Sequence, residues 1–171
     1  DLIAGAYGAF SLLAAERARR ETGRGQEIRL PLGTLAFATL GHLGQIAEVA
    51  TTGQDRSRQG NDLFGGFGRD FVTADGHRIM LFAITSRQWR DLVDALGLME
   101  AVAKLETRLG TSFAGDEGLR FQHRAALHPL FDGAVGAHTR AELADLFDGT
   151  GVCWSPYRTV HEAVQAEDRF G

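Results

Sequence analysis

The sequence predicts two pieces of mixed helix and strand structure, one of the α/β class and one of the α+β class. Residues 1–50 combine two apolar helical patterns with a short alternating stretch, as in a fragment of a larger α/β sheet domain. Residues 69–150 combine a hairpin turn with several amphipathic helices, as in a small α+β domain. We therefore expect two folded pieces, with residues 51–68 as the linker between them.

Composition and charge favour a globular protein and argue against nucleic-acid binding and membrane association. Of the 171 residues, 44% are hydrophobic and 23% charged, as in globular proteins rather than disordered ones. The net charge is −4 without a long run of one sign, so we expect no nucleic-acid partner. The apolar run Leu2–Ala15 is shorter than the ~20 residues of a membrane helix, so we expect no membrane association. Cys153 is the single cysteine, which fits the reducing cytoplasm.

The first piece is expected to begin with a long helix. Asp1 is typical of a helix N-cap, whose carboxylate accepts hydrogen bonds from the backbone N–H groups that follow. The helix is predicted over residues 2–21, and Gly23 is typical of the residue that ends it. Alternation over residues 27–32 predicts a short strand, and a second helix is predicted over 34–50.

The second piece contains a hairpin signal and two helix-start signals. The dipeptide Asp75-Gly76 is typical of a tight turn between two strands, expected at 70–73 and 78–83. Capping-box patterns at Thr85 with Gln88, and at Thr139 with Glu142, predict helix N-termini. The remaining expected elements are helices over 85–96, 99–109, 116–131, 139–147 and 159–166 and a strand over 152–154.

Asp1 is the first candidate for chemistry. A carboxylate at a helix start is stabilised by the positive end of the helix dipole and by backbone N–H groups. Such a carboxylate can act as a nucleophile on an activated acyl group. An ordinary N-cap role is the alternative that the residue pattern leaves open.

The segment Phe64-Gly65-Gly66-Phe67-Gly68 is the second candidate. Glycines allow backbone N–H groups to approach a ligand closely, and two adjacent N–H groups can stabilise an oxyanion. No Lys-Ser or Lys-Thr follows, so the segment is no phosphate-binding loop of the Walker type. A flexible linker is the alternative. Arg69 comes next and can meet a carboxylate, or can be an exposed charge at a strand edge.

The histidines and the cysteine give no metal or nucleophile pattern. None of the six histidines lies at metal-ligand spacing from another ligand, so we expect no metal site. His42 has apolar neighbours and is expected to be a packing residue, as is Trp89. Cys153 lacks a sequence-adjacent base and is expected to be a buried, unreactive thiol.

Several short motifs follow one another in a characteristic order. They are Asp1-x-x-x-Gly5, Thr22-Gly23-x-Gly25-Gln26, Arg58-x-Gly60-Asn61, Phe71-x-Thr73-x-Asp75-Gly76 and Gln88-Trp89. In order and spacing these motifs resemble those of the family III CoA-transferases, and the resemblance covers essentially the whole chain.

The resemblance implies an architecture. Members of this family are interlocked homodimers, in which each chain has a large Rossmann-like domain and a small α+β domain. Residues 1–50 would then be a fragment of the large domain and residues 69–150 the small domain, with 151–171 starting the return linker to the large domain. The chain would thus be an excerpt from a longer protein.

The resemblance also implies a reaction. The family's catalytic aspartate falls on Asp1, which would attack the thioester carbonyl of an acyl-CoA and then carry CoA as an aspartyl thioester. No separate cofactor is implied, because CoA enters as part of the substrate. The residues implied to bind the substrate are Asn61, Gly65, Gly66, Phe67, Gly68 and Arg69.

Within the family, Gly41-His42-Leu43-Gly44 and Trp154-Ser155-Pro156-Tyr157 resemble a subgroup that transfers CoA within one substrate molecule. In that subgroup CoA moves between the two carboxyl groups of mesaconate. The alternatives are transfer between two molecules and racemisation of an acyl-CoA, in which Asp1 would act as an acid or base. A further alternative is an inactive fragment or interaction module.

Overall fold

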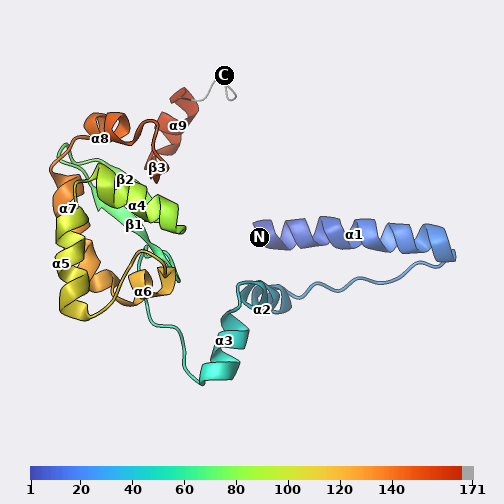
Figure 1. The fold of residues 1–171 in the computed structure, drawn as a ribbon. Coiled ribbons are helices and arrows are strands. Elements are labelled where there is room, and N and C mark those ends of the chain that lie inside the picture. Colours follow the sequence, from blue (N-terminus) through green and yellow to red (C-terminus); the bar gives the residue numbers. More distant parts are fainter. Residues whose placement is uncertain (167–171) are drawn as a thin grey trace. The chain divides into compact units, whose positions relative to one another are not determined.

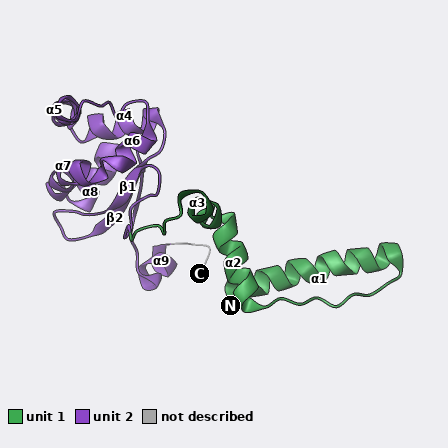
Figure 2. Ribbon diagram, turned by 90° about the horizontal axis from the view of Figure 1, so that it is seen from below, with its two compact units in different colours: residues 1–58 green, residues 59–171 purple. Residues whose placement is uncertain are grey.

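The computed structural model describes residues 1–166, and the chain divides into two compact units. The first unit is Asp1–Arg58 and the second begins at Gln59 (Figure 2). The division lies inside the segment 51–68, and the glycines at its end belong to the second unit.

The first unit opens with the predicted long helix. Helix α1 spans Leu2–Thr22 and ends at Gly23, whose φ of 72° is the left-handed conformation expected of the glycine that ends a helix. The carbonyl oxygen of Asp1 accepts the first helical hydrogen bond, from Gly5 at 2.9 Å. The expected side-chain cap is wrong, because the Asp1 carboxylate makes no cap hydrogen bond. The residue is exposed, where water competes for such a bond.

The first half of helix α1 is apolar around most of its circumference, yet none of the residues of α1 is buried in the structure. Leu2, Phe10 and Leu13 are 93%, 73% and 72% exposed. Contiguous apolar surface of this kind is typical of an interface rather than of a free helix.

The predicted strand over residues 27–32 is wrong. Residues 24–31 have no regular secondary structure, and helix α2 begins at Leu32 after Pro31. A strand forms only when its backbone groups pair with a neighbour, and the described sheet lies entirely in the second unit.

The predicted helix over residues 34–50 is two helices. Helix α2 spans Leu32–His42 and helix α3 spans Gln45–Thr52. Gly44 separates them with φ of 76°, a conformation that a helix interior does not contain. The single-helix prediction failed because the apolar pattern continues through Gly44, and the pattern does not indicate that this glycine has a positive φ.

The second unit is built on a three-stranded antiparallel sheet. Strand β1 (Phe67–Val72) pairs with β2 (Arg78–Ala83), and β2 pairs with β3 (Cys153–Pro156), in the order β1-β2-β3 (Figure 1). The predicted hairpin is confirmed, with Gly76 at φ of 77° in its turn. Because β3 is hydrogen-bonded to β2, the segment that begins near residue 151 contributes a strand to this unit.

Six helices accompany the sheet in the described part of the second unit. Helix α7 packs against β1, and α4 packs against β2. Both predicted capping boxes are present, at Thr85 with Gln88 and at Thr139 with Glu142. The helices are α4 (Ser86–Ala95), α5 (Met99–Leu109), α6 (Glu117–Gln122), α7 (Arg124–Gly136), α8 (Arg140–Phe147) and α9 (Val160–Ala166).

The predicted helix over residues 116–131 is wrong as a single element. It is broken at His123, which ends α6 and begins α7. No glycine or proline marks this break, so the residue pattern gave no signal for it. The chain changes direction between α6 and α7 (Figure 1).

The core of the second unit is aromatic. Phe67 and Phe71, two positions of β1 that share one face, are both wholly buried. The Phe67 ring lies 4.4 Å from the Phe131 ring of α7 and 5.3 Å from the Trp89 ring of α4, measured between centroids. Trp89 is therefore a core residue, as predicted.

Arg120 is a buried cation that the sequence analysis did not single out. Its side chain has no exposed surface, and its guanidinium donates to the carbonyl oxygens of Ile84 and Thr85 at 3.4 Å. The guanidinium carbon lies 5.4 Å from the Trp89 ring centroid. Burial lowers the pKa of Arg120 from its usual value, while nearby Glu117 opposes that shift. Arg120 thereby joins α6 to the end of β2.

Replacing Arg120 by Met keeps most of the side-chain volume and removes the donors. The carbonyl groups of Ile84 and Thr85 then lose buried partners, so we expect the free energy of unfolding to fall by about 1–3 kcal/mol. Thermal denaturation of the second unit measures this change. Arg108→Met, at an exposed position of α5, is the control and should stay within about 0.5 kcal/mol of the parent. Equal melting temperatures for Arg120→Met and the parent would contradict the assigned role.

Candidate functional site

Asp1 lies at the edge of a cavity in the first unit. The cavity has a volume of about 450 Å³ and is formed by α1 and α2. Apart from Asp1 and Thr39, its lining is apolar: Ile3, Ala4, Leu32, Leu35, Ala36 and Leu40. A carboxylate without an intramolecular cap, beside an apolar cavity, is chemically suited to meet the acyl part of a substrate.

His42 was expected to be a packing residue, but it is exposed in the structure and its contact is with one ring of α1. Its ring stacks on Tyr7 of α1 with centroids 6.4 Å apart and an interplanar angle of 21°. These two residues line a second cavity of about 410 Å³ together with Ala6 and Phe10. His42 therefore joins α1 to the end of α2.

In the second unit, residues Leu63–Gly68 form a closed turn, which we call the glycine turn. The Leu63 N–H donates to the Gly68 carbonyl oxygen at 2.8 Å, and the Gly66 N–H donates to the Leu63 carbonyl oxygen at 3.4 Å. Gly65 has φ of 80°, a conformation that favours glycine. These bonds make the segment an ordered turn rather than a flexible linker.

Gly68 is required by close packing between strands. A Cβ atom there would clash with the Cβ atom of Phe82 and lie 2.9 Å from the Leu81 carbonyl oxygen. Gly66 is less constrained, since the nearest atom to its added Cβ would be a terminal carbon of the Leu63 side chain, at 3.3 Å. The expected pair of adjacent free N–H groups is therefore not present, because the Gly66 N–H is already donated within the turn.

Phe67 was expected to contact a substrate, but its side chain is wholly buried in the aromatic core. Strand geometry explains this placement, because Phe67 shares the inner face of β1 with Phe71. Its role in the structure is to anchor the glycine turn.

Asn61 makes contacts within the protein. Its Nδ2 donates to Oδ1 of Asp70 at 3.1 Å, and Arg78 forms an ion pair with the same carboxylate. Burial of Asp70 opposes its ionisation, but the hydrogen bonds from Asn61 and Arg78 prevail and hold the pKa of Asp70 below its usual value. Asn61 therefore joins the segment before the glycine turn to β1.

Arg69 meets a carboxylate from its own chain. Its Nη2 donates to Oδ1 of Asp132 at 2.6 Å, and its Nη1 lies 3.4 Å from Nδ1 of His128. Arg69 shares one face of β1 with Phe67 and Phe71, because side chains two residues apart in a strand point to the same side. Helix α7 packs against β1, and the partners of Arg69 lie on that helix. The side chain is 30% exposed, so it is neither fully buried nor a free strand-edge charge.

The structure adds two charged residues and a histidine that the sequence analysis missed. Asp62 pairs with Arg124, with Oδ2 and Nε 2.9 Å apart, and its Oδ1 lies 3.7 Å from Nε2 of His128. Burial lowers the pKa of His128, although Asp62 acts in the opposite direction. Asp62 lies 62 positions from Arg124 and 66 from His128, so no local pattern could have indicated that it meets them.

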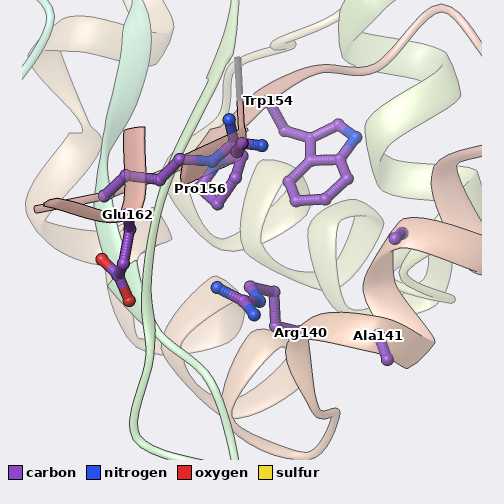
Figure 3. Close-up of a pocket in the computed structure, with 8 residues that line it drawn as sticks. Arg140, Ala141, Trp154, Pro156 and Glu162 are labelled. Carbon is purple, nitrogen blue, oxygen red and sulfur yellow. The ribbon is translucent and has the colours of Figure 1, made fainter. Parts of the chain in front are cut away.

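A further cavity lies between α8, β3 and α9, with a volume of about 390 Å³. Arg140 and Arg158 contribute positive charge to its lining, and Trp154 and Pro156 contribute an apolar wall (Figure 3). Glu162 also lines it, and hydrogen bonds from Thr159 hold the pKa of Glu162 below its usual value.

The predicted site residues fall into two groups. Asn61, Gly65, Gly66, Phe67, Gly68 and Arg69 lie together in the second unit, and Asp1 belongs to the first. Within residues 1–166, the structure contains no cluster of three or more side chains able to hold a metal ion. The described helices include none that is both long and apolar enough to cross a membrane.

A family model and two known proteins were found to be similar in sequence to this chain. The model of the CoA-transferase family III matches residues 1–170. The chain is 46% identical over 164 residues to 2-methylfumaryl-CoA isomerase from Chloroflexus aurantiacus, covering 96% of this chain and 40% of that protein. It is 28% identical to succinyl-CoA:mesaconate CoA-transferase from Haloarcula marismortui, covering 86% of this chain and 39% of that protein.

Solved structures agree with the sequence comparison. A CaiB/BaiF family protein from Brucella suis matches with a TM-score of 0.68 and 25% identity, over 98% of this chain and 42% of that one. The chain thus spans about 40% of the length of the curated relatives it matches. The resemblance inferred from the motifs is confirmed, and the chain belongs to the family III CoA-transferases.

Proposed function

We propose that this chain is the part of a CoA-transferase that supplies the nucleophile, Asp1, and the glycine turn. The proposed reaction is the transfer of CoA between the two carboxyl groups of mesaconate within one substrate molecule. The observation that carries this proposal is the 46% identity, across nearly the whole chain, to 2-methylfumaryl-CoA isomerase.

The proposed chemistry begins and ends with one thioester. The Asp1 carboxylate attacks the thioester carbonyl, the C–S bond breaks, and a mixed anhydride and CoA thiolate are formed. The thiolate attacks the Asp1 carbonyl carbon and releases the substrate carboxylate, which leaves an aspartyl-CoA thioester. The other carboxylate of the same molecule then attacks that thioester, and the thiolate completes the transfer by attacking the new anhydride. Asp1 is regenerated, and no external oxidant or proton donor is needed.

The geometry of Asp1 supports a nucleophilic role. Its carboxylate is not used as a helix cap, so its oxygens stay available. It also lies at the positive end of the α1 dipole, which favours the anion. The adjoining apolar cavity of about 450 Å³ supplies space for an acyl group.

We further propose how the chain fits into a whole enzyme. The first unit belongs to a large Rossmann-like domain, which would cover the exposed apolar residues of α1. The second unit corresponds to the small domain, and the complete protein works as an interlocked homodimer in the cytoplasm. CoA enters with the substrate, so no other cofactor is required.

Transfer between two molecules is the second candidate, favoured by the similarity to succinyl-CoA:mesaconate CoA-transferase. The full-length protein is incubated with mesaconyl-CoA and an excess of isotopically labelled free mesaconate. Transfer within one molecule leaves the CoA ester unlabelled as it isomerises, and transfer between molecules labels it. In deuterium oxide, entry of deuterium at the α-carbon of a saturated acyl-CoA would instead indicate racemase chemistry.

Asp1→Asn in the full-length protein tests the nucleophile. The amide keeps the size of the side chain but cannot form the anhydride, so we expect kcat/KM to fall by more than about 10³-fold. Steady-state assays with mesaconyl-CoA measure the loss, and circular dichroism checks that the fold is kept. Retention of more than about a tenth of the wild-type kcat/KM, a change below ~1.4 kcal/mol, would contradict the assignment.

Gly65→Ala tests whether the glycine turn takes part in the reaction. Gly110→Ala is the matched control, because both glycines have positive φ, 80° and 63°, and neither added Cβ meets an atom within 4 Å. Each substitution should cost about 1–2 kcal/mol of stability through backbone strain. Only Gly65→Ala should also lower kcat, by roughly 10- to 100-fold, through displacement of the turn. Equal kcat values for the two variants would show that the turn is structural only.

A further inference from the structure

The glycine turn is held against the junction of α6 and α7 by two neighbouring contacts. Oδ2 of Asp62 lies 2.9 Å from Nε of Arg124, and the Phe64 ring meets the Phe121 ring edge-on with centroids 5.2 Å apart. Asp62 directly precedes the turn, and Phe64 lies within it. The junction therefore contacts the turn on both sides of Leu63.

Arg124 has the central place in this arrangement. Besides Asp62, it donates through Nη1 to the Phe121 carbonyl oxygen at 2.8 Å. Its guanidinium carbon also lies 4.2 Å from the centroid of the Phe121 ring. The planar guanidinium thus pairs with Asp62, which directly precedes the turn. It also caps the end of α6 and stacks on Phe121, the residue that contacts Phe64. A lysine can supply the charge but not the planar, multiply bonded geometry.

Asp62 depends mainly on Arg124 for its charge partner. The neighbouring His128 is nine-tenths buried, its Nε2 lies 3.7 Å from Asp62 Oδ1, and that nitrogen has no hydrogen-bond partner among the described residues. Burial disfavours the charged imidazole. The other cation nearby, Arg69, already donates to Asp132 at 2.6 Å. Loss of Arg124 would therefore leave a largely buried carboxylate without a strong partner.

We propose that Arg124 is a positioning residue, which fixes the glycine turn through Asp62 and Phe121 so that the turn keeps one conformation during CoA transfer. The break between α6 and α7 at His123 makes this possible, because it brings the end of α6 and the start of α7 to the same edge of the turn. The inference rests on the proposed function for its catalytic consequence, but its structural part concerns the turn alone.

Amide hydrogen exchange in the full-length protein tests the structural part. In Arg124→Gln we expect the amides of Leu63 and Gly66, which donate within the turn, to exchange faster than in the parent. We expect kcat to fall by roughly 10- to 100-fold with little change in KM, since the substrate still binds but the turn is displaced. Arg124→Lys should restore part of both properties. Arg108→Gln, an exposed arginine of α5, is the matched control and should change neither.

Asp62→Asn supplies a second route if Arg124→Gln does not fold. It keeps the side-chain size, removes the charge that Arg124 binds, and should give the same faster exchange at Leu63 and Gly66. Unchanged exchange in the folded variants would overturn the inference, whatever the activity. Faster exchange with unchanged kcat would overturn the catalytic part. Full activity of Asp1→Asn with faster exchange in Arg124→Gln would reject the proposed function and leave the positioning of the turn intact.

Discussion

The position of the glycine turn depends on the burial of Phe67. This residue is part of the turn and is also the first residue of β1. Its ring packs on Phe131 and Trp89 in the aromatic core, so the backbone at the start of β1 has little freedom. Gly68 then allows β1 to approach Phe82 so closely that no side chain fits between them. The preceding glycines are therefore held at a fixed edge of the sheet, and a rigid scaffold of this kind is what a precise binding site requires.

Two polar residues beside the turn, Asn61 and Arg69, each have a hydrogen-bond partner within the protein. Asn61 bonds to Asp70, and Arg69 bonds to Asp132, so neither is a free group awaiting a substrate. In this structure the turn accordingly offers backbone rather than charged side chains to a ligand. Under the proposed function, the charged reactant is the carboxylate of Asp1, and the turn would act through its shape.

Local signals predicted several features of the second unit that depend on contacts between residues close in sequence. The capping boxes at Thr85 and Thr139 and the hairpin at Asp75-Gly76 are examples. Features that depend on distant partners were not predictable. The strand expected over 27–32 has no pairing partner in its own unit, and the break at His123 carries no residue signal.

The same distinction applies to the candidate site. Motif order predicted Asp1 and the glycine turn as site residues, because both are local features of the sequence. Asp62 and Arg124 lie 62 positions apart, and only the fold brings them together. Phe67 shows the limit of motif reasoning most clearly, because its position in the glycine motif suggested substrate contact while strand alternation assigns it to the core.

Trapping the covalent intermediate tests the central claim most directly. The full-length protein is incubated with mesaconyl-CoA and hydroxylamine, which converts an activated carboxylate into a hydroxamate, and its peptides are analysed by mass spectrometry. The account predicts that Asp1 is modified during turnover and that the modification requires the acyl-CoA. Turnover with an unmodified Asp1, or a hydroxamate on another carboxylate, would contradict it.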